Sequence, residues 1–233
     1  MKEKDFVKSI RKSFELLNSM ELCDWSDFPN PTSLNVSDEF KKVALDPGSA
    51  YEDIFKAALR LNHFNFVLVD LSMFQLSRRI EDGNEIYRYS FLPNPFGVSA
   101  AEISDSFETL LHGAEIVDQV FDEAEIIIDR PPIRFDFDVK GYRPPGHPAG
   151  HFHIGGYNNN RWPVDKLLTP EVFVCVVAKH YFLDHWNIGI KSEPTDSGFF
   201  NYFDEQFANL KKECLDLRDE FFDSNEQKLF HFT

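Results

Sequence analysis

The sequence predicts an α+β fold, in which a central, mainly antiparallel sheet carries packed helices. Apolar residues recur at helical spacing in some segments and alternate with polar residues in others. The turn sequence Glu81-Asp82-Gly83-Asn84 joins two alternating segments as a hairpin. No internal repeat or linker interrupts the 233 residues, so we expect residues 1–233 to form one domain.

The N-terminal quarter is predicted to be helical. Apolar residues recur every three or four positions over residues 3–22, which indicates an amphipathic helix. A loop rich in Pro, Asn and Ser follows. Ser37 is a candidate N-cap for a short helix that ends at Leu45, and Ser49 is a candidate N-cap for the next helix.

The middle of the chain is predicted to form strands. Residues 64–71 are an apolar, β-branched run that is typical of a buried strand. Residues 73–79 and 85–91 flank the hairpin turn, and Tyr87, Tyr89 and Phe91 are expected to share one face.

The second half alternates between the two patterns. Residues 99–125 predict one long helix, and residues 133–139 and 151–154 predict strands. Thr169, followed by proline, is a good helix start, and that helix is expected to reach about residue 185. A last amphipathic helix is expected near 203–222.

Composition limits the function. The formal net charge is −15, which repels nucleic-acid backbones and anionic lipid, so nucleic acid is expected to bind only through a local site. A basic protein partner suits the charge, although the charge also serves solubility alone. The 25 phenylalanines predict a core built on aromatic rings.

Cysteine usage and hydropathy favour a cytoplasmic protein that does not enter a membrane. Cys23, Cys175 and Cys214 are widely spaced and odd in number, which argues against a disulfide framework or a cysteine zinc site. Charged residues follow Met1 where a signal peptide would be apolar, and the longest apolar run, Val172 to Ala178, is too short to span a bilayer.

Polar side chains cluster on the two strands predicted at 133–139 and 151–154. Because strand side chains alternate between faces, the phenylalanines and Ile154 are expected to face the core. The opposite face then carries two carboxylates, two imidazoles and an arginine, if the strands pair. These are Arg134, Asp136, Asp138, His151 and His153, and His147, Arg143 and Arg161 lie in the flanking loops.

This set of side chains suits two kinds of chemistry. Carboxylate oxygens and imidazole nitrogens together are ligands for Zn, Mn, Fe or Ni, and a bound metal activates water as a nucleophile. Without a metal, a histidine beside an aspartate is a general base, while Arg134, Arg143 or Arg161 holds a phosphate oxygen. Two further interpretations stay open: a structural ion-pair network between Arg134 and the aspartates, and a polar surface that binds a partner.

One segment resembles a known family. Arg134 to Asp138 is followed by His147-Pro148-Ala149-Gly150-His151-Phe152-His153-Ile154-Gly155, then by Asn159 to Val164 and by Thr169-Pro170. This order is similar to that of an uncharacterised bacterial family, domain of unknown function 2290. The family has no established activity. The resemblance implies a bacterial or phage source, and such genes often lie in toxin–antitoxin or anti-phage defence loci.

Two functions are therefore expected from the sequence. The first is a metal-assisted or His/Asp-dependent phosphodiester hydrolase, a nuclease-type effector. In it Asp136, Asp138, His151 and His153 are ligands or acid–base groups, His147 is a further ligand or acid, and Arg161 clamps phosphate. The second is a non-enzymatic acidic protein that binds a partner, such as an immunity protein, an antitoxin or a regulatory subunit.

Overall fold

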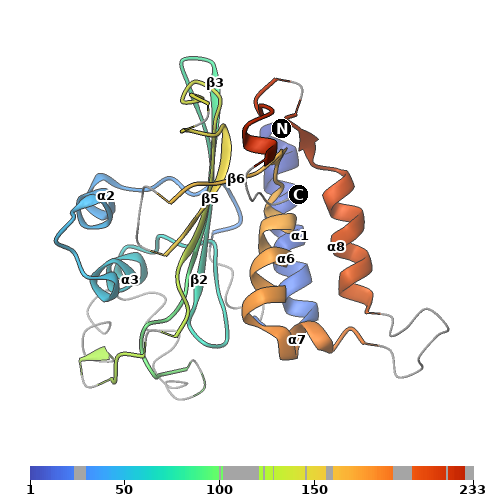
Figure 1. Ribbon diagram of the computed structural model, residues 1–233. Coiled ribbons are helices and arrows are strands. Elements are labelled where there is room, and N and C mark those ends of the chain that lie inside the picture. The colour runs from blue at the N-terminus through green and yellow to red at the C-terminus, as the bar shows by residue number, and fades with distance from the viewer. Residues whose placement is uncertain are drawn as a thin grey trace.

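A computed structural model gives the fold of this chain. It describes residues 1–23, 30–99, 101, 121–122, 124–127, 129–144, 146–155, 160–190, 201–218 and 220–228. In these residues a six-stranded sheet stands between two layers of helices (Figure 1). The predicted α+β class is confirmed.

The predicted hairpin lies inside the sheet. β2 (Met73–Glu81) and β3 (Asn84–Leu92) pair antiparallel along their whole length. Asp82 and Gly83 join them with φ of 48° and 76°. Two successive residues with positive φ are typical of a type I′ turn, whose twist matches that of the strands, and aspartate and glycine tolerate this conformation best.

The strands follow one another in the order β1-β2-β3-β4-β5-β6, and every neighbouring pair is antiparallel. The other members are β1 (Phe66–Val67), β4 (Ile133–Asp138), β5 (Gly150–Ile154) and β6 (Trp162–Pro163). β1 is shorter than the strand predicted at 64–71, because the chain turns back at Leu68, whose N–H donates to the carbonyl of Ser72. The strands predicted at 133–139 and 151–154 are confirmed.

One face of the sheet is covered by α1 (Glu3–Ser19) and α6 (Pro170–Tyr181), and α8 (Tyr202–Lys212) packs against α6 on the side away from the sheet (Figure 1). The large aromatic core lies between these helices and the sheet. It contains Tyr87, Tyr89 and Phe91 of β3 and Phe135 of β4, all fully buried, so the predicted inward faces are confirmed.

The other face carries a smaller core under α2 (Asp38–Leu45) and α3 (Tyr51–Arg60) (Figure 1). The Ser37 side chain accepts from the N–H of Phe40, which confirms the predicted cap of α2. The predicted cap of α3 is wrong: Ala50, not Ser49, occupies that position, and it has no side-chain acceptor. This second core covers only part of the face, and the polar cluster lies on the same face.

Three predicted helices end earlier than expected. The first ends at Ser19, and the chain leaves helical geometry at Glu21, with φ of 58°. The helix capped by Thr169 ends at Tyr181, and a separate short helix, α7 (Leu183–Asn187), follows because Phe182 has ψ of 51°. The last helix ends at Lys212, where the chain enters β8.

Four short elements were not predicted, and the first of them is β6. β7 (Lys166–Leu167) and β8 (Leu215–Asp216) form a separate two-stranded ladder, and the 3-10 helix η2 (Glu226–Lys228) follows. Most of the helix predicted at 99–125 lies outside the described residues. Within the part of the chain that is described, no helix is long and apolar enough to span a membrane.

Candidate metal centre

The polar cluster is built from two rows of side chains that cross the sheet. In the first row, Arg88 of β3 lies opposite Asp136 of β4, which lies opposite His151 of β5. In the second row, Arg134 of β4 lies opposite His153 of β5. Directly opposed residues have their Cβ atoms about 5 Å apart, so the register alone gathers these five side chains. The predicted common face of Asp136, His151 and His153 is confirmed.

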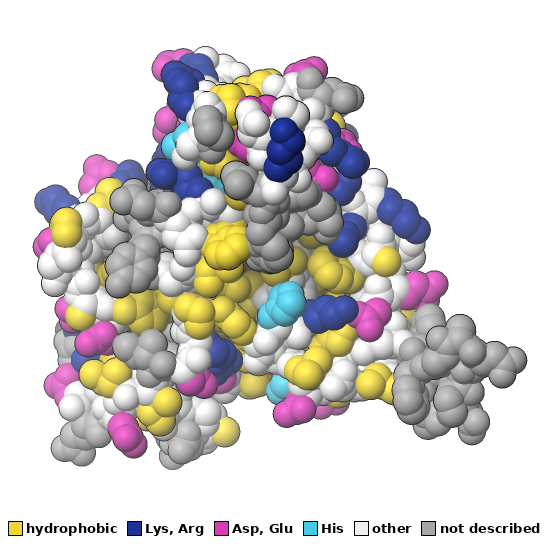
Figure 2. All heavy atoms as spheres, viewed as in Figure 1, with side chains coloured by type: hydrophobic (Ala, Val, Ile, Leu, Met, Phe, Trp, Pro, Cys, Tyr) yellow, Lys and Arg dark blue, Asp and Glu magenta, His cyan; other side chains and the backbone are white. Residues whose placement is uncertain are grey.

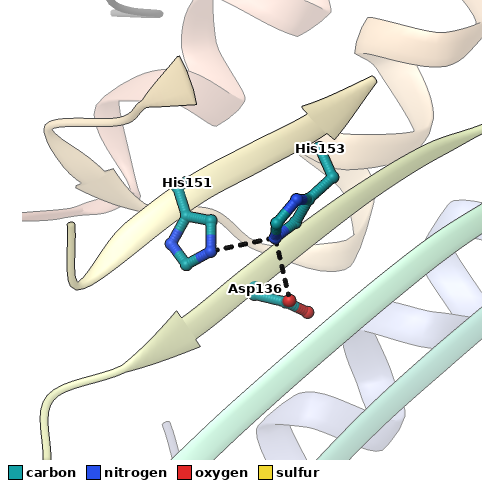
Figure 3. A group of neighbouring side chains, drawn as sticks. All are labelled: Asp136, His151 and His153. Carbon is teal, nitrogen blue, oxygen red and sulfur yellow. Dashed lines mark hydrogen bonds and ion pairs between the residues drawn. The ribbon is translucent and has the colours of Figure 1, made fainter. Parts of the chain in front are cut away.

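Three side chains point to one place. His151 and His153 extend from β5 toward Asp136 on the neighbouring strand (Figure 3). The two Nε2 atoms are 3.1 Å apart, and Nε2 of His153 is 3.4 Å from Oδ2 of Asp136. One donor atom from each of the three residues lies within 4.8 Å of the other two. Among the described residues this is the group of His, Cys, Asp and Glu side chains suited to a metal ion.

The hydrogen bonds fix the tautomer of His151. Its Nδ1 lies 2.9 Å from the carbonyl oxygen of Pro148, which only accepts, so Nδ1 carries the proton. Nε2 of neutral His151 therefore presents a lone pair to the centre of the cluster. A backbone carbonyl in this position is a common support for a histidine that binds metal.

Burial sets the charge of His151. Its side chain is 3% exposed, and burial lowers its pKa to about 4, although the negative charge of Asp136 opposes this shift. His153 is similarly buried, at 4% exposure. The sequence analysis placed both imidazoles on the face opposite the main core, which is correct, but that face is closed to solvent at this point.

Asp136 is an ionised carboxylate held by cations. Oδ1 accepts from Nε of Arg88 at 2.8 Å, and Oδ2 accepts from Nε of Arg134 at 3.0 Å. Burial raises the pKa of Asp136, but the hydrogen bond from His153 and the two guanidinium groups outweigh burial and hold the pKa below its usual value. The predicted pairing of Arg134 with an aspartate is thus present.

The spacing of the donor atoms suits a metal ion. Metal–ligand bonds of about 2.0–2.1 Å in tetrahedral or octahedral geometry separate neighbouring donor atoms by about 2.9–3.4 Å. The separations of 3.1 and 3.4 Å fall in this range, and the third pair, His151 and Asp136, lies within 4.8 Å. One feature fits less well: Nδ1 of His153 is buried and has no hydrogen-bond partner among the described residues.

Asp138 and His147 lie beside this group and not within it. Oδ1 of Asp138 accepts from Nδ2 of Asn84 at 2.7 Å. A Cβ atom on Gly141 would lie 3.0 Å from Oδ2 of Asp138 and 3.2 Å from Cε1 of His147, so these two groups meet over the glycine. The ring centroids of His147 and His151 are 5.3 Å apart.

The two other predicted arginines, Arg143 and Arg161, have different surroundings. Nη1 of Arg143 donates to the carbonyls of Lys140 and Tyr142, so its side chain supports its own loop. The charge of Arg161 is one of the causes, after burial, that lower the pKa of Arg134, so the two guanidinium groups are within electrostatic range of each other. Nε of Arg161 is buried without a partner in the part of the chain that is described.

Arg88 was not predicted from the sequence as a member of the cluster. It lies 48 positions before Asp136, and only the pairing of β3 with β4 brings them together. The alternation of Tyr87, Tyr89 and Phe91 put Arg88 on the outer face, but the sequence did not indicate which strand lies next to β3. Arg88 is also the most open member, with 47% of its side chain exposed.

A family model described as an uncharacterized conserved protein, DUF2290, matches residues 22–233. The match includes all the residues of the cluster and extends far beyond the segment that carries the resemblance. No curated protein and no solved structure matches the chain.

Proposed function

The chain belongs to the DUF2290 family, and we propose that it is a metal-dependent hydrolase that cleaves phosphodiesters. Asp136, His151 and His153 hold the metal ion. The proposal includes the nuclease-type activity expected from the sequence, directed to a local site on an otherwise acidic protein.

One observation carries the proposal: one donor atom from each of Asp136, His151 and His153 lies within 4.8 Å of the other two, and two of these separations are 3.1 and 3.4 Å, on a face that also carries guanidinium groups. Two histidines and one carboxylate form a donor set that binds Zn, Mn, Fe or Ni, and a metal held by so few protein ligands keeps positions open for water. A metal-bound water loses its proton near neutral pH and becomes a nucleophile.

The arginines suggest what the nucleophile attacks. Arg88 and Arg134 each form an ion pair with Asp136, and Arg161 is within electrostatic range of Arg134. A phosphodiester carries one negative charge that such groups bind through paired hydrogen bonds. In the proposed reaction the water oxygen attacks phosphorus and the bond to the leaving alcohol breaks. His147 would accept the proton that the water gives up, directly or through Asp138, and this proton would then pass to the oxygen of the leaving alcohol.

The metal test uses thermal unfolding. Chelator-treated protein is melted alone and with Mn²⁺, Zn²⁺ or Ni²⁺, and hydrolysis of bis(p-nitrophenyl) phosphate is followed in the same samples. We expect at least one metal to raise the Tm and support hydrolysis, because a ligand that binds only the native state stabilises it. His153→Gln and Asp136→Asn are expected to lose both effects.

The matched control is His180→Gln, since His180 is an exposed histidine on α6 and lies outside the cluster. It should respond to metal as the wild type does. If no metal shifts the Tm of the wild type either with or without inorganic phosphate in the buffer, or if His153→Gln keeps the full shift, the metal centre is wrong. The network of Asp136 with its arginines is then structural.

A second candidate function is the binding of a basic partner, and a specific surface favours it. Apolar side chains gather on the face between the sheet and α6 (Figure 2). Near the end of α6, pockets of about 360 and 490 Å³ share His180 and Tyr181. The larger one is lined by two exposed apolar residues, Val69 and Leu183, and by Asp70, Asp129 and Asp184. Arg130 in the same lining pairs with Asp70 and Asp129, which leaves Asp184 as the acid that it does not contact.

Neither pocket is lined by a residue of the cluster, so the two functions are separable by mutation. A partner that uses this surface should lose affinity when Leu183 is replaced by Asp, and hydrolysis should be unchanged.

A further inference from the structure

The carboxylate of Asp136, a proposed metal ligand, already has hydrogen-bond partners. Both of its oxygens accept hydrogen bonds from guanidinium groups, from Arg88 on Oδ1 and from Arg134 on Oδ2. Its side chain is only 13% exposed, so little water replaces these partners. A metal ion on Oδ2 would share this oxygen with Arg134 and withdraw charge from both ion pairs.

The positive charges near Asp136 disfavour the binding of a metal ion when no anion is bound. The carboxylate of Asp136 is contacted by two guanidinium groups, those of Arg88 at 2.8 Å and Arg134 at 3.0 Å. The negative charge of Asp136 is therefore already offset by these two cations before any ion binds. A divalent cation that enters this site is repelled by the arginines, and the repulsion is stronger in a buried site than in water.

A phosphate group removes this opposition. It supplies negative charge and several acceptor oxygens, which pair well with the planar guanidinium donors. Arg88 is the natural point of entry, because nearly half of its side chain is exposed while Asp136 and the imidazoles are covered. When the arginines turn to phosphate, the carboxylate is released to the metal.

We propose that this site takes up its metal ion and a phosphate group together, so that each raises the affinity for the other. The inference rests on the proposed function, because the same three ligands hold the metal, and it adds an order of events. The protein without substrate binds metal weakly, and the substrate phosphate completes the site. Thermodynamic linkage makes the effect reciprocal: metal must strengthen phosphate binding by the same factor.

The test is a calorimetric titration of Mn²⁺ into the metal-free full chain. One series contains inorganic phosphate, and the other contains chloride at the same ionic strength. We expect Mn²⁺ to bind about tenfold more tightly, or better, with phosphate, which lies within the usual range of coupling between two ligands. The reverse titration, phosphate into protein with and without Mn²⁺, should give the same factor.

Two arginine variants locate the coupling. Arg88→Ala should bind Mn²⁺ at least as well as the wild type in chloride, since one repelling charge is gone, and should lose most of the phosphate effect. The matched control is Arg79→Ala. Arg79 is a half-exposed arginine on the neighbouring strand β2 that pairs with Glu81, and its loss should leave the coupling unchanged.

The outcomes separate the two proposals. If Mn²⁺ binds equally well with and without phosphate, the coupling is wrong and the metal centre stands. If Mn²⁺ binds under neither condition, both are wrong, even where phosphate binds alone. If Arg88→Ala keeps the full coupling, the role given to the arginines is overturned. The comparison of the two wild-type series depends on no variant and holds even if a substituted protein fails to fold.

Discussion

His151 is a buried imidazole whose surroundings favour the neutral form. Nδ1 donates to the carbonyl of Pro148, and Nε2 faces the ring of His153, which offers no negative charge. A proton on Nε2 would place a second donor against His153 in a site with little water. Burial accordingly lowers the pKa of His151 from 6.5 to about 4, against the attraction of Asp136.

This pKa predicts how stability depends on pH. The metal-free native state stays unprotonated at His151 down to about pH 4, while the unfolded chain takes up a proton near pH 6.5. Between these values the unfolded state binds more protons, so the free energy of unfolding falls as the pH is lowered. The loss is up to about 3 kcal/mol, from the conversion of pKa differences into free energy.

Urea denaturation in chelator at several pH values measures this slope. His151→Gln should lose this part of the pH dependence, and the exposed His180→Gln should keep it. Asp136 acts at lower pH, because its native pKa lies below its usual value and its contribution is lost only as the pH falls through that native pKa. A slope that is unchanged in His151→Gln would show that this imidazole is accessible to protons in the native state.

At the scale of the strands, the sequence predicted the site better than it predicted the sheet. The alternation in β4 and β5 placed the phenylalanines inward and Asp136, His151 and His153 outward, because side-chain period is a local property. The hairpin was predictable for the same reason. Arg88 was not predictable, since the pairing of β3 with β4 is set by packing between distant segments, and β6, β7 and β8 are two-residue strands without a local pattern.

The inward faces of these strands support the site from below. Phe137 is 5% exposed, and its ring lies 5.8 Å from that of Tyr87 in an edge-on contact. Phe137→Ala should reduce the free energy of unfolding by about 3–5 kcal/mol, because it empties an aromatic core position. Ile80→Ala on β2 is the control: Ile80 is 58% exposed and should cost less than about 0.5 kcal/mol. An unchanged denaturation midpoint in Phe137→Ala would contradict the assigned faces.

For the whole molecule, charge is unevenly distributed. Asp and Glu number 39 against 24 Lys and Arg, and yet three arginines gather at or near one buried carboxylate. The general field repels anions at a distance, and the cluster attracts them at close range. A phosphodiester substrate should therefore bind slowly at low salt and faster as salt screens the acidic surface, which is the reverse of a basic nuclease.

Arg88 and Asp136 are 48 positions apart in the sequence, whereas the hairpin of β2 and β3 is closed by a loop of two residues, Asp82 and Gly83. Loop-closure entropy makes short-range pairs form early in folding and long-range pairs form late. We therefore expect a mutation in the hairpin turn to change the folding rate and a mutation in the Arg88–Asp136 pair to change the unfolding rate. Gly83→Ala, which forces φ of 76° on a residue with a side chain, should slow refolding. Asp136→Asn should leave refolding nearly unchanged and accelerate unfolding. Stopped-flow refolding and unfolding of the two variants would detect this difference, and a slower refolding of Asp136→Asn would mean that β3 and β4 meet before the transition state.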